Sequence, residues 1–521
     1  MNKAVAESLP GPGNAGERRL RQLLLCLLLA AFGFSAAHLG PGLQDDAFIS
    51  FTYARNLADG FGPVYNPGER VEGYSSPLYV GLLALLSLIL PMGIPAIAVY
   101  LGLLAGLLTC YLVFRFAEQE LHSPLAALLL LLPFALLPPL LAETMGGMET
   151  MLYVLAIVLL LVLEDRGSRW SWLVMAAVAL LRPEGIFLVL GYLLARLLLR
   201  PGERKATWRL LSLVALVYVL FLAWRTLYYG ELVANTFYVK TPFSLELLTQ
   251  GLQSLWRFAL RVPLLLLPAA AGAVFGRWKR AWPWLYAVLF YLVFIPYVGG
   301  GFKFTFRYYL YMVGPLFLLI IQLAARLRRR LPRLILAILL VWGVVAGVYH
   351  YHAFGRALGF HGMRKQVVRR QQELAGVLTG LYPPGTVMAT GQAGAIKYYT
   401  RFITIDMLGL CDKHIARQPF DQRGVSLVGH LKGDGKYVLA RNPDIILFHS
   451  VLFRKKPMNI SQIRARVLSG KKFSAWLSEL QIMQTPSFWL QYNMNRVQLS
   501  DCYSHFFVKG EIQAADREQS Y

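Results

Sequence analysis

The chain has 521 residues, of which 56% are hydrophobic and only 15% are charged, and its mean hydropathy is +0.49. Soluble globular proteins carry about 25% charged residues, so this composition excludes an ordinary soluble domain and indicates that much of the surface meets lipid. The formal net charge of +24 would also suit a partner of nucleic acid. The distribution of the charges argues against nucleic acid, because the basic residues form short clusters between long apolar runs.

The first part of the chain, residues 1–350, is dominated by these apolar runs. A bilayer core takes about 20 apolar residues per helix, and uninterrupted runs exclude the alternating pattern of a β-barrel. We therefore expect a polytopic α-helical membrane protein with about 11 transmembrane helices. The predicted spans are residues 23–38, 94–115, 124–141, 149–164, 171–182, 185–199, 208–226, 259–275, 282–298, 308–325 and 333–350.

Another apolar segment, residues 78–90, is short and ends at Pro91. If it were a full span, the basic clusters after residues 164 and 199 would fall on the side opposite to Arg18–Arg21. We therefore predict a juxtamembrane or re-entrant helix here. Every large basic cluster then lies on the cytoplasmic side, as the positive-inside rule requires. The N-terminus is predicted to be cytoplasmic and the C-terminal region extracytoplasmic.

The composition becomes mixed from about residue 351, which predicts an extracytoplasmic α/β domain over residues 351–521. Its expected elements are a strand at Thr386–Thr390, a helix at Gln392–Tyr399, a strand at Phe402–Asp406 and a helix-to-strand passage over Tyr437–Arg441 and Asp444–Phe448. Cys411 and Cys502 also lie here. They are candidates for a disulfide, although two cysteines alone do not establish one.

Polar segments rich in acids, aromatic residues and glycine all fall on the extracytoplasmic face in this topology. They are Gln44–Ser76, Glu143–Glu149, Arg182–Gly185, Tyr228–Thr241 and Gly299–Arg307. An arbitrary loop is most often only a solvated connection. Ionisable groups close to the ends of membrane spans are costly to keep, so their convergence favours a functional surface.

Two adjacent carboxylates, Asp45 and Asp46, begin the first extracytoplasmic loop (residues 39–77). One of them can act as a general base, and the pair can hold a divalent cation, because hard cations take carboxylate oxygens. Alternatively, either aspartate can cap a helix over Ala47–Leu57. Spacing alone favours the cap.

The rest of the first extracytoplasmic loop favours a catalytic role over a helix cap. From Asp45 to Tyr79 it reads DDAFISFTYARNLADG-FGPVYNPGERVEGYSSPLY. This segment resembles the first loop of the GT-C membrane glycosyltransferases, and it looks most like the branch that contains the terminal arabinofuranosyltransferases of mycobacterial cell walls and their bacterial relatives. In that superfamily an acidic pair in the first extracytoplasmic loop marks the active site, so the resemblance favours catalysis.

Further motifs resemble the same family in the same order along nearly the whole chain. They are Gly147–Thr150, Arg182–Gly185, Tyr228–Glu231, Asn235–Lys240, Ile405–Leu410, Gly429–His430 and Asn442–Asp444. One loop departs from the pattern, because relatives often have Gly-Gly-Asp where this chain has Gly299–Gly301.

The resemblance implies an inverting transfer of a sugar from a polyprenyl-phosphate donor to an extracytoplasmic glycan or protein, at a bacterial inner membrane. Asp45 is then the expected general base. Asp46 is a metal ligand (for Mg, Mn or Ca) or orients the acceptor, and the two roles can be exchanged. No nucleotide is needed. Arabinofuranose follows from the branch, and a hexose remains open. A lipid or sugar transporter is the alternative class, and a non-catalytic scaffold is a third.

Cations must stabilise the phosphate that leaves with the lipid. The candidates are Arg182, Lys240 and Arg307, followed by Arg55 and Lys303; the ordinary alternative for each is contact with lipid headgroups. The candidates for binding sugar or acceptor are Glu72, Tyr74, Glu149, Asn235 and Tyr238. Glu149 and Glu184 also suit structural bonds to neighbouring helices.

Overall fold

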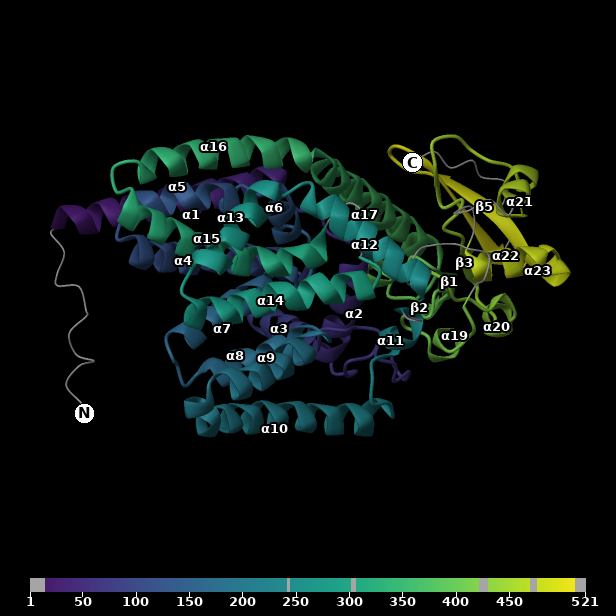
Figure 1. Cartoon of the computed structure of the whole chain (residues 1–521). Helices are drawn as coiled ribbons and strands as arrows, with labels where there is room; N and C mark the ends of the chain where they lie inside the picture. Colours follow the sequence, from purple (N-terminus) through teal and green to yellow (C-terminus); the bar gives the residue numbers. More distant parts are fainter. Residues whose placement is uncertain (1–14, 241–243, 301–305, 421–429, 469–475, 511–521) are drawn as a thin grey trace.

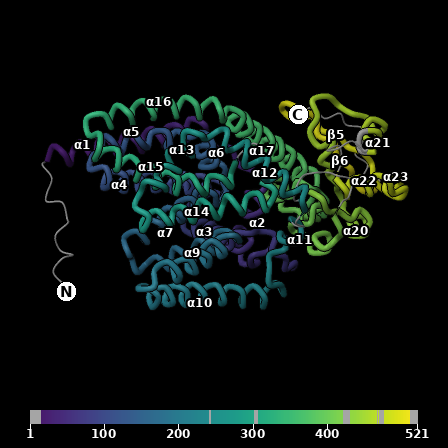
Figure 2. The backbone as a smooth tube through the Cα atoms, viewed as in Figure 1, coloured from purple at the N-terminus to yellow at the C-terminus, as the bar shows by residue number. Residues whose placement is uncertain are grey.

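The computed structural model describes residues 15–240, 244–300, 306–420, 430–468 and 476–510. A bundle of helices occupies most of the molecule, and a smaller strand-containing domain lies at one end of it (Figure 1). The chain enters the bundle at the end farthest from this domain, and the same arrangement is visible in the backbone trace (Figure 2).

Helices occur at every predicted span. They are α1 (Ala15–Leu39), α4 (Ile94–Leu121), α5 (Pro124–Ala135), α6 (Pro138–Thr144), α7 (Thr150–Asp165), α8 (Ser171–Leu181), α9 (Gly185–Leu199), α10 (Arg204–Tyr229), α12 (Leu245–Ala259), α13 (Pro263–Phe275), α14 (Trp278–Tyr297), α15 (Leu310–Arg330) and α16 (Ile335–Ala353). In the described part of the chain, five helices are long and apolar enough to cross a membrane alone, and two bent pairs raise this number to seven. The total of 11 spans stays a prediction.

Two predicted spans are interrupted. Residues 124–141 form α5 and α6, which meet at 71°, and α12 meets α13 at 92° just inside the predicted span 259–275. Each second helix starts with a proline, Pro138 or Pro263. Proline has no N–H to continue the preceding helix, and it pushes the residue before it out of the helical region. Leu137 accordingly has an extended backbone.

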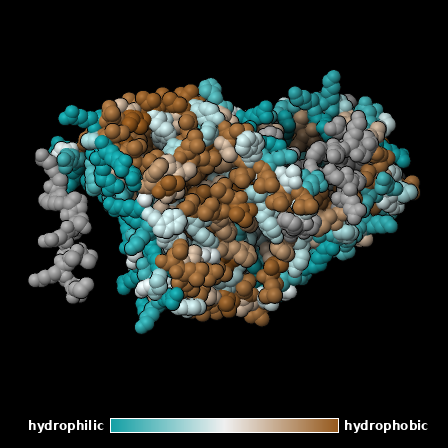
Figure 3. Space-filling view, viewed as in Figure 1, coloured by the Kyte–Doolittle hydropathy of each residue, from teal (hydrophilic) through white to brown (hydrophobic). Residues whose placement is uncertain are grey.

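The surface of the bundle has the character of a membrane protein. Figure 3 shows an apolar band across the middle of the helices, with hydrophilic surface at both ends of the molecule. Helix α10 lies at the edge of the bundle and exposes large apolar side chains such as Leu216, Val219 and Leu227 (Figures 1 and 2). Because apolar surface on this scale is costly in water, this face belongs in lipid.

The basic clusters of the sequence meet at the end of the bundle opposite the strand-containing domain (Figure 1). Arg21 in α1 pairs with Glu118 at the end of α4. Arg280 in α14 pairs with Asp165 at the end of α7. The separation of the basic end from the other polar loops agrees with the expected sorting of charge.

The loop after α1 folds back on the bundle. It carries α2 (Asp45–Ala58) and ends at α3 (Pro77–Ile89), which corresponds to the predicted juxtamembrane helix. Helix α2 packs against α3 and, from the C-terminal domain, against α18 (Ala395–Thr400). Helix α11 (Asn235–Lys240) follows α10 at the same end of the bundle.

The long helix α17 (Gly355–Leu381) leads from α16 to a mixed sheet with the order β2-β1-β3-β6-β4. Strands β1 (Val387–Thr390), β2 (Ile403–Asp406) and β3 (Ile445–Leu447) are parallel, whereas β6 (Tyr503–Lys509) runs antiparallel to β3, β4 (Phe453–Arg454) and β5 (Tyr492–Gln498). The remaining helices are α19 (Lys413–Ala416), α20 (Gly435–Ala440), α21 (Ile460–Leu468), α22 (Leu477–Gln484) and α23 (Pro486–Gln491). The predicted strand–helix–strand order and the later helix-to-strand passage are confirmed.

Alternation along the short strands builds a core on each face of this sheet. Ile445 and Leu447 pack with Leu374 and Leu378 of α17, whereas Ile446 packs on the opposite face. Cys411 and Cys502 both carry free thiols and belong to different buried clusters. The disulfide considered from the sequence is therefore not formed.

Candidate active site

The acidic pair lies where the C-terminal domain meets the first loop. Helix α2 begins at Asp45, and its N-cap is Gln44, which makes no side-chain capping bond. The Asp45 carboxylate instead accepts a hydrogen bond of 2.8 Å from the backbone N–H of Ala395. The interpretation of the aspartates as ordinary helix caps is therefore wrong. Asp45 is half-buried at a domain contact, and Asp46 is exposed beside it.

Burial raises the pKa of the Asp45 carboxyl to about 6. The N–H of Ala395 and the Gln371 side chain lower this pKa by hydrogen bonding, and the charge of Asp46 raises it. A carboxylate with a raised pKa holds a proton more readily than a solvated aspartate, and it is still ionised at neutral pH. These are the properties that a general base needs.

The C-terminal domain contacts Asp45 without any intervening side chain. A Cβ atom added to Gly394 would lie 2.0 Å from the Asp45 carbonyl oxygen and 2.5 Å from its Oδ1. Only glycine permits this approach. Behind it, the fully buried Gln371 of α17 donates to Gln392 at 2.9 Å, and the Gln392 amide contacts His449 Nδ1 at 2.6 Å. A polar chain thus runs from the candidate base into the C-terminal domain.

Helix α17 also holds the residues before the acidic pair. Arg364 donates to the buried Glu143 at 2.9 Å, and Gln44 donates to the other oxygen of the same carboxylate at 2.9 Å. His361 Nε2 contacts the Gly40 carbonyl at 2.9 Å. The entry to α2 is therefore fixed by the bundle and the C-terminal domain together.

The segment that contains Glu149 packs against α2. A Cβ atom on Gly147 would lie 2.4 Å from Leu43 and 3.8 Å from Ala47, which follows Asp46 directly. Two residues of extended chain span at most about 7 Å, so Glu149 lies close to the acidic pair. The start of α7, which has Glu149 as its N-cap, therefore lies near the start of α2.

Arg182 is the centre of a cluster of charged side chains. Its Nη1 lies 2.5 Å from Glu149, its Nε lies 2.9 Å from Glu184, and all three side chains are buried. The guanidinium also lies over the rings of Tyr308 and Tyr311, at 5.3 and 5.8 Å from their centroids. These ion pairs confirm the alternative that Glu149 and Glu184 make structural bonds. Their two negative charges exceed the single positive charge of Arg182 by one.

Arg307 lies beside this cluster, and the exposed Lys240 is near enough for its charge to reach Tyr308. The charges of Arg307, Arg182 and Lys240 all act on the Tyr308 hydroxyl. The Arg307 guanidinium lies over the Tyr308 ring at 5.3 Å, and it makes no ion pair with any described residue. The cluster thus combines cations from three loops that are far apart in sequence, and the charge of Glu149 acts on Arg307 as well as on Arg182. Lys303 lies outside the described residues.

Two predicted residues instead bind the loop to α10. Glu72 is buried and pairs with Arg225 at 2.8 Å. The hydroxyl of Tyr74 lies 3.1 Å from the hydroxyl of Tyr229, which donates to the Pro63 carbonyl. Both side chains face protein partners rather than open space.

Three further predicted residues contact the C-terminal domain. Asn235 donates to the carbonyls of Gly409 and Leu410 at 2.8 and 3.0 Å. Arg55 donates to the Tyr398 carbonyl at 2.6 Å. Tyr238 lies 4.6 Å below the guanidinium of Arg417. The structure therefore gives these residues docking contacts between the two parts of the chain.

Sequence reasoning missed Arg225, Tyr308, Gln371 and Gly394. Arg225 carries a signal, because it is an arginine inside a predicted span, and such residues are kept only with a partner. The others carry no local signal, since their roles arise only from contacts with distant segments.

A divalent cation would find few protein ligands here. Among the described residues, no three His, Cys, Asp or Glu side chains come together in a way that could hold a metal. Magnesium is often held by one or two carboxylates together with water and substrate phosphate. Asp46, with Asp45 beside it, fits that limited role.

Solved structures share the architecture of this chain. The structure of ArnT from Cupriavidus metallidurans bound to undecaprenyl phosphate superposes with a TM-score of 0.50 and 13% identity, and the match covers 74% of this chain and 85% of that one. Its apo state matches equally well, at 14% identity. The chain has the GT-C fold. In this fold the acidic pair begins helix α2 in the loop that follows α1, and its role as the active site stays a prediction.

Two sequence comparisons match only part of this chain. A terminal β-(1→2)-arabinofuranosyltransferase of Corynebacterium glutamicum is 33% identical over 105 residues, which are 19% of this chain and 15% of that protein. The chain therefore matches only a small part of this relative. A domain of unknown function (DUF8728) matches residues 361–499, within the C-terminal domain.

Proposed function

We propose that this chain is a glycosyltransferase that moves a sugar from a polyprenyl-phosphate donor to an acceptor outside the membrane. The observation that carries the proposal is the presence, within one GT-C fold, of Asp45, a half-buried carboxyl with a raised pKa, and of a cation group around Tyr308 made of the buried Arg182, the half-buried Arg307 and the exposed Lys240. A base and an anion site are the two groups that this reaction needs. The ArnT structure with bound undecaprenyl phosphate supports a donor of this class.

The proposed reaction is a direct displacement. Asp45 takes the proton of the acceptor hydroxyl while the hydroxyl oxygen attacks the anomeric carbon. The bond from that carbon to the phosphate oxygen breaks, and the polyprenyl phosphate leaves with its negative charge. Arg307, Lys240 and Arg182 stabilise that charge. Attack from the opposite side inverts the anomeric configuration.

Asp46 orients the acceptor in this scheme, or it helps to hold a divalent metal (Mg, Mn or Ca) that would supply further positive charge. The predicted roles of Glu72, Tyr74 and Asn235 in binding sugar are then indirect, through the loop that they hold in place. Glu149 keeps Arg182 in position beside Tyr308.

We further propose arabinofuranose as the donor sugar, which the partial match to the corynebacterial enzyme supports. The same reaction with a hexose is the alternative. We place the protein in a bacterial inner membrane with its basic end in the cytoplasm and its C-terminal domain in the periplasm, and the segregation of the basic clusters supports this orientation. The acceptor is an extracytoplasmic glycan or protein.

The test uses the purified full-length chain with a series of polyprenyl-phosphate sugars, with and without a chelator. Asp45→Asn is expected to abolish transfer, and Asp46→Asn is expected to weaken it. Asp59→Asn, at the exposed end of the same helix, is the matched control and should retain the wild-type rate. If both Asp45→Asn and Asp46→Asn still transfer sugar at the wild-type rate, the proposed site is wrong.

A further inference from the structure

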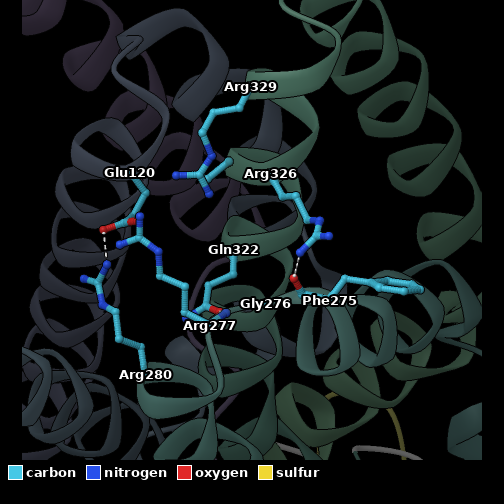
Figure 4. Close-up of a pocket in the computed structure, with 9 residues that line it drawn as sticks. Glu120, Phe275, Gly276, Arg277, Arg280, Gln322, Arg326 and Arg329 are labelled. Carbon is cyan, nitrogen blue, oxygen red and sulfur yellow. Dashed lines mark hydrogen bonds and ion pairs between the residues drawn. The ribbon is translucent and has the colours of Figure 1, made fainter.

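A pocket opens at the basic end of the bundle, far from the candidate active site. It lies among the ends of α4, α13, α14 and α15 and holds about 380 Å³, including the solvent at its mouth (Figure 4). Its polar lining consists of Arg277, Arg280, Arg326, Arg329, Glu120 and Gln322. Nothing in the proposed sugar transfer uses these residues.

The arginines of the pocket are only partly compensated. Arg280 is held by Asp165 at 2.5 Å and by Glu120 at 2.7 Å. Arg326 donates to a neutral acceptor, the Phe275 carbonyl, at 2.6 Å.

Four arginines thus face two carboxylates, which leaves a net charge of +2 at the pocket. Within the described part of the chain, Arg277 and Arg329 have no carboxylate partner. Figure 4 shows their side chains reaching toward the same space beside Glu120.

Gln322 provides an independent sign of a ligand. It is 6% exposed, and its Oε1 accepts the backbone N–H of Arg277 at 3.0 Å. That bond sets the orientation of the amide, so the Nε2 group is the donor at the other side. Nε2 is buried and has no hydrogen-bond partner. A buried donor without a partner is costly, and such groups in native proteins usually meet a ligand or water.

We propose that this pocket binds a phosphate group. Arg277 and Arg329 hold its oxygens from the open side, because planar guanidinium groups suit phosphate geometry. Gln322 Nε2 donates to it from the buried side. Two sources share this chemistry: the headgroup of an anionic phospholipid, which basic pockets between membrane helices recognise, and a soluble phosphate. The inference is independent of the proposed glycosyltransferase activity.

The test measures binding to the full-length protein in detergent by native mass spectrometry. The probes are phosphatidylglycerol, zwitterionic phosphatidylcholine and inorganic phosphate. The pocket variant is Arg277→Gln/Arg329→Gln, and the control is Arg18→Gln/Arg19→Gln, which removes two exposed arginines from the same end of the bundle. A further variant, Arg329→Gln alone, keeps every bond of Arg277, and an unchanged melting temperature shows that each variant is folded.

Wild type and control are expected to retain one phosphatidylglycerol in preference to phosphatidylcholine. The pocket variant should bind it at least about tenfold more weakly, because charge-assisted hydrogen bonds are lost, and Arg329→Gln should fall between them. If inorganic phosphate binds with the same dependence on the variants and the lipid does not, the source is soluble phosphate. The proposal is overturned if the pocket variant binds both probes as tightly as wild type, or if the control loses as much affinity as the pocket variant.

Discussion

Gly394 offers the sharpest test of the idea that the C-terminal domain positions the catalytic base. In Gly394→Ala, the added methyl group would lie 2.0 Å from the Asp45 carbonyl oxygen and 2.5 Å from its Oδ1. Carbon and oxygen atoms in ordinary contact are about 3.5 Å apart. The substitution therefore forces α2 and the start of α18 apart by roughly 1 Å or more, and it breaks the hydrogen bond from Ala395 to Asp45.

The expected cost follows from this displacement. A shift of about 1 Å in a reacting group lowers the rate about 100-fold, which corresponds to about 2.7 kcal/mol in the activation free energy. The lost hydrogen bond also matters, because it lowers the pKa of Asp45. The pKa of the base should therefore rise further, and the acidic limb of the pH–rate profile should move to higher pH.

The assay is steady-state sugar transfer from a polyprenyl-phosphate donor, measured across pH for wild type, Gly394→Ala and Gly380→Ala. Gly380 lies on α17, and a Cβ atom there would meet nothing within 4 Å, so its variant controls for the change from glycine to alanine. A folded Gly394→Ala protein with the wild-type kcat and pH profile would refute the reasoning that the C-terminal domain sets the geometry of Asp45.

Other predictions concern the base and the contacts that hold the first loop. For wild type, kcat/KM should fall about tenfold per pH unit below about 6, because Asp45 must be deprotonated to accept a proton; a flat pH–rate profile would contradict its role as the base. Arg225→Met should lower the free energy of unfolding by about 3–5 kcal/mol, since it leaves Glu72 buried without its partner, and adding Glu72→Gln should recover part of the melting temperature. Asn235→Ala should lower the free energy of unfolding by about 1–3 kcal/mol, because it leaves the Gly409 and Leu410 carbonyls of the C-terminal domain without their donor. Limited proteolysis should then release that domain faster than in wild type.

Much of the fold is readable from the sequence, because its signals are local. Long apolar runs predicted helices that the structure contains, and short segments in the mixed-composition C-terminal part predicted β1, β2 and β3. Local signals did not predict where a membrane-spanning helix is interrupted. The breaks before Pro138 and Pro263 turn two predicted spans into bent pairs, because a proline acts on the backbone geometry of its neighbours even inside a run that is apolar throughout.

Some residues of the candidate site were also recognisable from the local sequence, and others were not. Asp45 and Asp46 were recognisable from the pattern of their own loop. The partners of Arg182 were partly recognisable, since Glu184 lies two residues away in the same motif. The docking contacts of Arg55 and Asn235 were not, because each is made with a segment more than 150 residues distant.

The sequence by itself therefore determined the class of the protein: an apolar, basic-ended helical chain with a strand-containing C-terminal domain and an acidic pair in its first polar loop. Only the tertiary structure decided what surrounds that pair. It showed that Asp45 is not a helix cap, that Gly394 and Ala395 contact it, and that Arg307 keeps a charge that no described carboxylate pairs with. The physical reason is that hydropathy and helix signals act within a few residues, whereas burial, ion pairing and the pKa of a carboxyl depend on which distant segments come to lie beside it.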